Sequence, residues 1–257
     1  MYDAEHTDRL LNSNIELNTM KQHSKQVQRL CVLAILVIAV SAAAFSYWVL
    51  NQGARNASCR NDVFVLREYL RKYAANHEGL LPPISPTRGN LMIDPKGFYP
   101  EHLENSCWLQ CEWSDARRRG RHGKNDDLGL SGFNDDSFCY LPWAIANETE
   151  GLAFIEAYKS LDLNTQPKNL TVHIDGGERV LSRIRFSDAV LEKTVETAQS
   201  GPPIVVEWPD KFHTNGTVLF ADGRIVTMKM GEDFPMTEKF IAALREIASI
   251  DRPLSTR

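Results

Sequence analysis

One apolar stretch near the start of the chain decides its layout. Leu30–Leu50 reads LCVLAILVIAVSAAAFSYWVL, 21 residues without a charged side chain. A helix of this length is about 30 Å long, which matches the hydrocarbon core of a bilayer. Tyr47 and Trp48 near its end are typical of the membrane interface. We therefore expect residues 30–50 to form a transmembrane helix.

This stretch has two other interpretations. Helices buried in a soluble core rarely exceed about 14 apolar residues. A cleaved signal peptide would use the small residues Ser41–Ala44 as its cleavage site. However, the apolar character continues to Leu50, and a polar segment of 29 residues precedes the stretch. We expect a retained anchor on an uncleaved chain, with cleavage as the alternative.

The charges that flank the anchor predict its orientation. The polar tail, residues 1–29, is expected to be disordered because it holds little apolar surface. Three basic residues end this tail and two follow the anchor: Lys21, Lys25 and Arg29 against Arg55 and Arg60. This bias favours a cytoplasmic tail and an exported domain, residues 55–257, in the periplasm of a bacterium with the anchor in its inner membrane. The net charge of −4 argues against nucleic acid as a partner.

Cysteine usage is compatible with export. Cys31 lies in the anchor, which leaves four cysteines on the exported side: Cys59, Cys107, Cys111 and Cys139. In an oxidising compartment they can form two disulfides, with three possible pairings, or they can remain thiols. A zinc site that uses His122 with three of them is an alternative, but the spacing lacks a second matching Cys pair.

Periodicity predicts an α+β domain after the anchor. Val63, Leu66, Leu70 and Tyr73 lie on one face of an amphipathic helix that Gly79 stops. Two hairpins are predicted around Asp-Gly pairs, which type I′ turns favour. Further elements are a strand, a helix capped by Asn147, a second strand and a last helix. The predicted elements are the hairpins Leu170–Ile174 with Arg179–Phe186 and Thr217–Ala221 with Arg224–Met230, the strands Phe138–Trp143 and Pro203–Trp208, and helices at 147–161, 188–199 and after Thr237, with long loops over residues 80–136.

Four patches resemble a known bacterial family. The segment His213-Thr-Asn-Gly-Thr-Val-Leu-Phe-Ala-Asp222-Gly223 is similar to the C-terminal His-x₉-Asp-Gly motif of prepilin-like proteins, with eight residues here instead of nine. Tyr140–Phe154, Pro203–Trp208 and Phe234–Phe240 are similar to other parts of that family. The resemblance implies the layout of a type IV pilin or type II secretion pseudopilin, with one N-terminal helix, half in the membrane and half docked on a small antiparallel sheet. No prepilin cleavage signature precedes Leu30, so we expect a permanently anchored relative.

Polar residues offer two candidate sites. His213 and Asp222, with His173, Asp175 and Glu207, are the residue types of a metal-dependent hydrolase, but turn formation explains Asp222 and Gly223 more simply. Asp/Asn clusters in a Gly-rich loop are a candidate calcium site, although such clusters are usually solvated turns. The calcium candidates are Asp126, Asp127, Asp135 and Asp136.

The function expected from these patterns is structural. We interpret the chain as a non-catalytic, pseudopilin-like interaction protein of a bacterial envelope, without a required cofactor. Its expected partners are the lipid bilayer and secretion or pilus-type assembly proteins, or a second copy of itself. The alternative is a membrane-tethered hydrolase that uses His213 and nearby Asp residues.

Overall fold

Two units make up the chain, and each is described by itself. The computed structural model describes residues 4–103, 106–109, 129–133, 135, 137–165, 167–186, 201–208 and 215–249; of these, residues 4–32, 52, 55, 56, 107, 108, 131, 132 and 249 are described as backbone alone. The first unit is Met1–Gly53 and the second is Ala54–Arg257. The helix α1, Ala4–Asn76, contributes to both.

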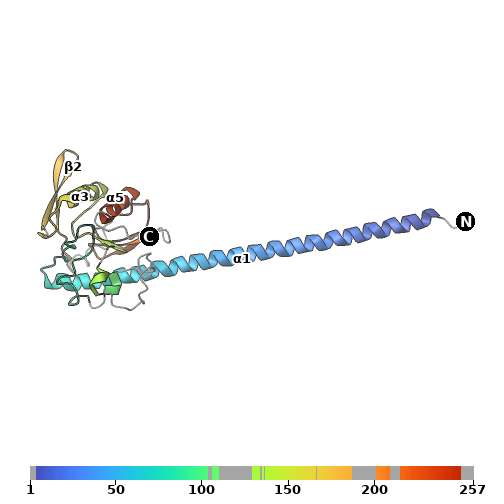
Figure 1. Ribbon diagram of the computed structural model, residues 1–257, viewed down its shortest axis with the longest axis horizontal. Helices are drawn as coiled ribbons and strands as arrows, with labels where there is room; N and C mark the ends of the chain where they lie inside the picture. The colour runs from blue at the N-terminus through green and yellow to red at the C-terminus, as the bar shows by residue number, and fades with distance from the viewer. Residues whose placement is uncertain are drawn as a thin grey trace. The chain divides into compact units, whose positions relative to one another are not determined.

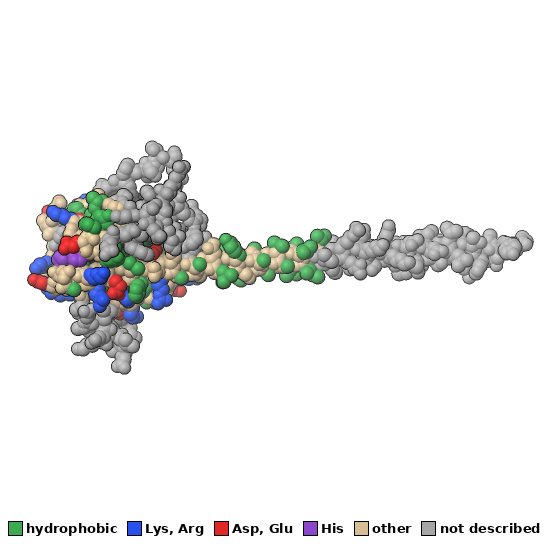
Figure 2. Space-filling view, turned by 90° about the horizontal axis from the view of Figure 1, so that it is seen from below, with side chains coloured by type: hydrophobic (Ala, Val, Ile, Leu, Met, Phe, Trp, Pro, Cys, Tyr) green, Lys and Arg blue, Asp and Glu red, His purple; other side chains and the backbone are tan. Residues whose placement is uncertain are grey.

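In the first unit α1 contains the predicted apolar segment. Leu33–Asn51 is long and apolar enough to cross a bilayer, and none of it is buried. Figure 2 shows apolar side chains along this part of α1. A membrane anchor and a signal sequence share these properties. The predicted disorder of residues 1–29 was wrong, because α1 begins at Ala4. Residues 1–52 lack both Gly and Pro, and a helix already formed in the apolar segment extends into them without a new nucleus.

In the second unit the amphipathic half of α1 contributes to the core. The predicted face is buried: Val63, Leu66 and Leu70 are inaccessible to solvent and Tyr73 nearly so. The helix ends where Gly79 adopts a φ of +80° and its N–H donates to the carbonyl of Ala74 at 2.8 Å. This backbone conformation is one that glycine adopts without steric cost.

Two antiparallel sheets form the β part, where we predicted one. The larger sheet has the order β1-β4-β5-β6, in which β6 is an edge strand. The second sheet pairs β2 with β3 only, and β2, whose buried residues are Leu170 and Val172, lies beside α3. The strands are β1 Phe138–Tyr140, β2 Asn169–Ile174, β3 Gly177–Ser182, β4 Pro203–Glu207, β5 Asn215–Phe220 and β6 Ile225–Lys229.

Helices α3, Glu148–Ser160, and α5, Glu238–Ser249, lie side by side (Figure 1). The predicted cap of α3 is confirmed, since Asn147 Oδ1 accepts the N–H of Glu150 at 3.0 Å. At the other end of α3, Arg88 donates to the carbonyls of Tyr158, Lys159 and Leu161. These bonds satisfy carbonyl groups that a helix leaves open at its C-terminus.

The segment predicted as long loops is irregular where the structure describes it. It contains turns, two short 3₁₀ helices, η1 Ser106–Leu109 and η2 Gly129–Gly132, and a bridge between Ile84 and Ile93. Several of its apolar side chains are nevertheless fully buried in the core, among them Leu91, Met92 and Phe98. The helix predicted at residues 188–199 lies outside the described residues.

Candidate functional site

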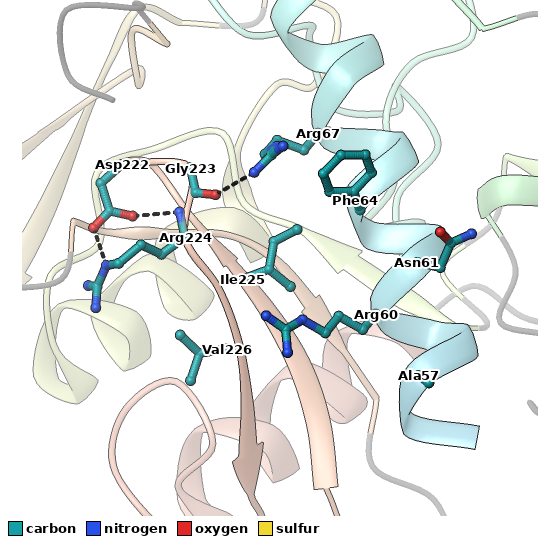
Figure 3. A pocket seen from close by; sticks show the side chains of 10 residues that line it. All are labelled: Ala57, Arg60, Asn61, Phe64, Arg67, Asp222, Gly223, Arg224, Ile225 and Val226. Atoms are coloured by element: carbon teal, nitrogen blue, oxygen red, sulfur yellow. Dashed lines mark hydrogen bonds and ion pairs between the residues drawn. The ribbon is translucent and has the colours of Figure 1, made fainter. Parts of the chain in front are cut away.

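A groove of about 740 Å³ lies between α1 and the turn that joins β5 to β6, within the second unit (Figure 3). Arg60, Phe64 and Arg67 line one wall, and residues 222–226 line the other. The α1 residues lie beside the buried face of the helix, at helical spacing of three and four. Phe64 is 47% exposed, which is unusual for an aromatic side chain at the margin of a core.

The turn at the groove differs from the predicted type I′ turn. Leu219 pairs with Ile225, and the N–H of Gly223 donates to the carbonyl of Phe220 at 2.8 Å. Gly223 has a φ of +82°, whereas Asp222 has no positive φ. This is a three-residue hairpin loop, a type I turn followed by a left-handed residue. The Asp-Gly pair is therefore used, but only its glycine needs the left-handed conformation.

Asp222 holds this turn together. One of its oxygens, Oδ1, accepts the backbone N–H of Arg224 at 3.0 Å, and Oδ2 accepts from Arg224 Nε at 2.6 Å. The Asp222 side chain is 2% exposed, whereas that of Arg224 is 47% exposed. Both carboxylate oxygens are thus engaged by one neighbouring residue, which is the role of a turn residue rather than a metal ligand.

Arg67 ties α1 to the same turn. Its Nη1 donates to the carbonyl of Gly223 at 3.2 Å, while Nε and Nη2 donate to Glu68. The guanidinium carbon also lies 4.4 Å from the centre of the Phe64 ring, a cation–π distance. Because its charge is paired with Glu68 and Nη1 binds the Gly223 carbonyl, Arg67 joins α1 to the turn rather than offering the groove an unpaired charge.

Among the described residues Arg60 supplies the unpaired positive charge of the groove, whereas Arg224 is ion-paired with Asp222. Arg60 is exposed and has no ion-pair partner among the described residues. Figure 3 shows its side chain extending from α1 toward β6. The Arg224 guanidinium carbon lies 5.5 Å from the centre of the Phe220 ring, and its terminal nitrogens have no hydrogen-bond partner in the described part of the chain. Among the described residues of the lining Asp222 is the only acid, and it is paired with Arg224. The groove can therefore accept an anionic partner that also has apolar surface.

Buried carboxylates elsewhere in the domain also bind backbone N–H groups. Asp135 accepts from Leu91, Glu150 from Ala146 and Glu207 from Thr217, at 3.0, 2.8 and 2.8 Å. Asp135 joins separate segments, Glu207 joins β4 to β5, and Glu150 binds a residue of its own segment; each of the three is at most 4% exposed. Glu150 also pairs with Arg179 at 3.0 Å. These acids are part of the fold.

The structure describes only some of the predicted site residues. His213, Asp126, Asp127 and Asp136 lie outside the described residues. Asp135, the remaining calcium candidate, is buried and bound to Leu91 as above. Among the described residues no group of three or more His, Cys, Asp or Glu side chains could hold a metal ion. The hydrolase candidates His173 and Asp175 lie on the β2–β3 hairpin, in a different sheet from Asp222.

A second Asp-Gly turn departs from prediction in the same way. Ile174 pairs with Gly177, so Asp175 and Gly176 form a two-residue loop. Gly176 has a φ of +83°, and Asp175 has no positive φ. A positive φ at only the second central residue is the pattern of a type II turn, not type I′.

Cysteine chemistry is settled for two of the predicted positions. Cys59 is disulfide-bonded, and its partner lies outside the described side chains. Cys139 is a free, fully buried thiol. Because Cys139 is unpaired, the two-disulfide arrangement considered from the sequence is not formed. Burial also raises the pKa of the Cys139 thiol far above its usual value, which suits neither a zinc ligand nor a nucleophile.

The groove itself was not predicted. From the sequence, Arg60 was expected only as a charge that flanks the apolar segment, and no role in a site was assigned to Arg67. The available signal was an aromatic residue, Phe64, set between two arginines on that face.

Comparisons with known proteins found no match to this chain: no family model, no curated protein and no solved structure matches it.

Proposed function

We propose that this chain is a non-catalytic interaction protein of a bacterial envelope, anchored in the inner membrane by residues 30–50. Its domain, residues 55–257, lies in the periplasm and binds an anionic partner in the groove between α1 and the β5–β6 turn. The partner is a membrane-associated component of a secretion or pilus-type assembly, in keeping with the resemblance to pseudopilins.

This proposal rests on the side chains that the groove leaves exposed for a partner. The buried carboxylates Asp135, Glu150, Glu207 and Asp222 all accept backbone N–H groups. The side chains left exposed at the groove are arginines beside Phe64, a pairing typical of protein recognition sites. This contrast favours binding over hydrolysis by Asp222.

Two further features support the location. The side chains of Leu33–Leu50 are exposed along the whole apolar segment, which is the surface that a lipid bilayer would cover. The disulfide at Cys59 is a bond that persists in oxidising compartments such as the periplasm.

Site-specific photocrosslinking in native membranes tests the proposal. Benzoylphenylalanine would replace Phe64 in the groove or, as a control, Val180, which is 54% exposed on β3. We expect Phe64 to give an adduct with a defined envelope assembly protein and Val180 to give none. Equal adducts at both positions, or none at Phe64, would contradict the proposal.

A further inference from the structure

The sheet edge beside the groove has unpaired backbone groups. The N–H of Phe220 donates to the carbonyl of Arg224 at 3.0 Å and closes the hairpin. In an antiparallel ladder hydrogen-bonded and non-hydrogen-bonded pairs alternate, so Val226 bonds to β5 while its neighbours Ile225 and Thr227 do not. The N–H and C=O groups of Ile225 and Thr227 therefore point away from β5.

This edge is closed at one end and open at the other. Lys229 is the next residue with outward groups, and Glu232 occupies both of them. The Lys229 N–H donates to Glu232 Oε2 at 3.0 Å, and its carbonyl accepts the Glu232 N–H at 3.2 Å. Ile225 and Thr227 have no such bonds within the described part of the chain. An edge strand with free groups is a template for another strand.

The open part of the edge adjoins the groove. Ile225 and Val226 line the groove, with Phe64 facing them from α1. Arg60 extends across the same space, and Arg224 stands at the start of β6 (Figure 3). A strand added here would meet an apolar surface, the exposed terminal nitrogens of Arg224 and the guanidinium of Arg60, which is unpaired in the described part of the chain.

We propose that the groove binds an extended acidic segment of the partner polypeptide as an additional strand on β6. Its main chain would bond to Ile225 and Thr227, and its carboxylates would pair with Arg60 and Arg224. This inference rests on the proposed function and specifies the chemistry of the partner. An anionic lipid headgroup would bind the arginines but not the strand edge. Dependence on the strand edge therefore distinguishes a peptide from a lipid.

Peptide binding to the full chain in detergent micelles tests strand addition. The probe is a fluorescein-labelled peptide of about eight residues that alternates glutamate and valine. Two comparison peptides replace glutamate by lysine or carry N-methyl groups along the backbone. We expect saturable binding of the acidic peptide, with at least about tenfold weaker binding of both comparison peptides.

Variants of the chain test each half of the site. Arg60→Glu removes a guanidinium, and Lys72→Glu makes the same charge change on α1 outside the groove. Thr227→Pro removes an outward N–H without removing a β5–β6 bond, because edge positions of this kind tolerate proline. Arg60→Glu and Thr227→Pro should each weaken binding at least about tenfold, and Lys72→Glu should not. Thermal melting checks that the variants fold; if Thr227→Pro does not, the N-methylated peptide tests the edge alone.

Two results would overturn strand addition. One is the absence of saturable binding by the acidic peptide. The other is equal binding of the N-methylated peptide together with displacement by short-chain phosphatidylglycerol, which would identify an anionic-lipid site. Either result combined with a Phe64 crosslink to an assembly protein would remove the strand-addition inference and leave the proposed function intact.

Discussion

Asp222 stabilises the β5–β6 turn through its side chain, and Gly223 does so through its backbone conformation. The Asp222 carboxylate binds Arg224 on two atoms, and Gly223 supplies the left-handed residue that closes the loop. A side chain at position 223 would be strained at a φ of +82°. The two residues are thus needed for different physical reasons.

Gly223→Ala should destabilise the domain by about 1 kcal/mol because alanine disfavours positive φ. Gly177→Ala is the matched control, since Gly177 has no positive φ and an added Cβ would approach only the Ile174 carbonyl, at 3.9 Å. Urea unfolding followed by tryptophan fluorescence measures both variants. Equal losses would contradict the role assigned to Gly223.

Metal removal should leave the turn unaffected. Both Asp222 oxygens are bound to Arg224, so we expect a chelator to leave the Tm of the full chain and of Asp222→Asn unchanged relative to each untreated protein. A chelator-induced fall in the parent that Asp222→Asn abolishes would restore the metal-site hypothesis. An effect of calcium that persists in Asp222→Asn would direct attention to Asp126, Asp127, Asp135 and Asp136.

The Cys139 thiol should make stability depend on pH. Burial raises its pKa in the folded state, whereas an unfolded thiol ionises near about pH 8.5. The contribution of the protonated thiol to the free energy of unfolding is complete below that pH. It falls as pH rises above it, because only the unfolded state then releases the proton. Between pH 7 and about 9.5 the parent should lose about 1 kcal/mol more than Cys139→Ala in urea unfolding. Identical losses would show that the thiol ionises in place.

At the scale of elements, the contact between α3 and α5 depends on one missing side chain. A Cβ at Gly151 would lie 2.5 and 2.8 Å from two atoms of the Phe240 ring and 3.0 Å from Phe234. A Cβ added at Gly216 on β5 would likewise lie 2.6 Å from the Glu207 carbonyl oxygen and 2.7 Å from Met236. Both glycines permit close approach of elements that are distant in sequence.

Gly151→Ala should therefore destabilise the domain by about 1–3 kcal/mol through overpacking. In an unconstrained helix the same change is stabilising by about 1 kcal/mol, so the sign of the effect is informative. Phe240→Leu removes ring atoms from the contact, and the cost of Gly151→Ala should fall in that background. Additive costs in the urea-unfolding double-mutant cycle would rule out the close contact.

At the scale of the whole molecule, the apolar segment and the charges around it define the expected orientation. Lys21, Lys25 and Arg29 precede the apolar segment, and for a membrane anchor this favours a cytoplasmic N-terminus. A reporter enzyme that works only outside the cytoplasm should be active when fused at Arg257. A cytoplasm-specific reporter fused at the same position serves as the reciprocal control, and activity of that reporter alone would reverse the topology.

Local sequence patterns were sufficient to predict most of the helices and strands that the structure describes. Helical spacing from Val63 to Tyr73, the cap at Asn147 and the Asp-Gly pairs each depend on neighbours a few residues away. The amphipathic part of α1, the helix α3 and both hairpins were therefore predicted close to their observed positions. The exact turn types were missed because φ at Asp175 and Asp222 depends on loop length and register. The helical tail was missed because continuity with the apolar helix outweighed its polar composition.

Only the tertiary structure determined which distant elements and residues are in contact. The groove joins Arg67 to Gly223, residues 156 positions apart, and no local pattern encodes that contact. The same holds for the separation of β2 and β3 into their own sheet and for the open edge at Ile225 and Thr227. Sequence periodicity determines which faces of helices and strands are buried, whereas sheet order and long-range packing determine which exposed groups meet to form a site.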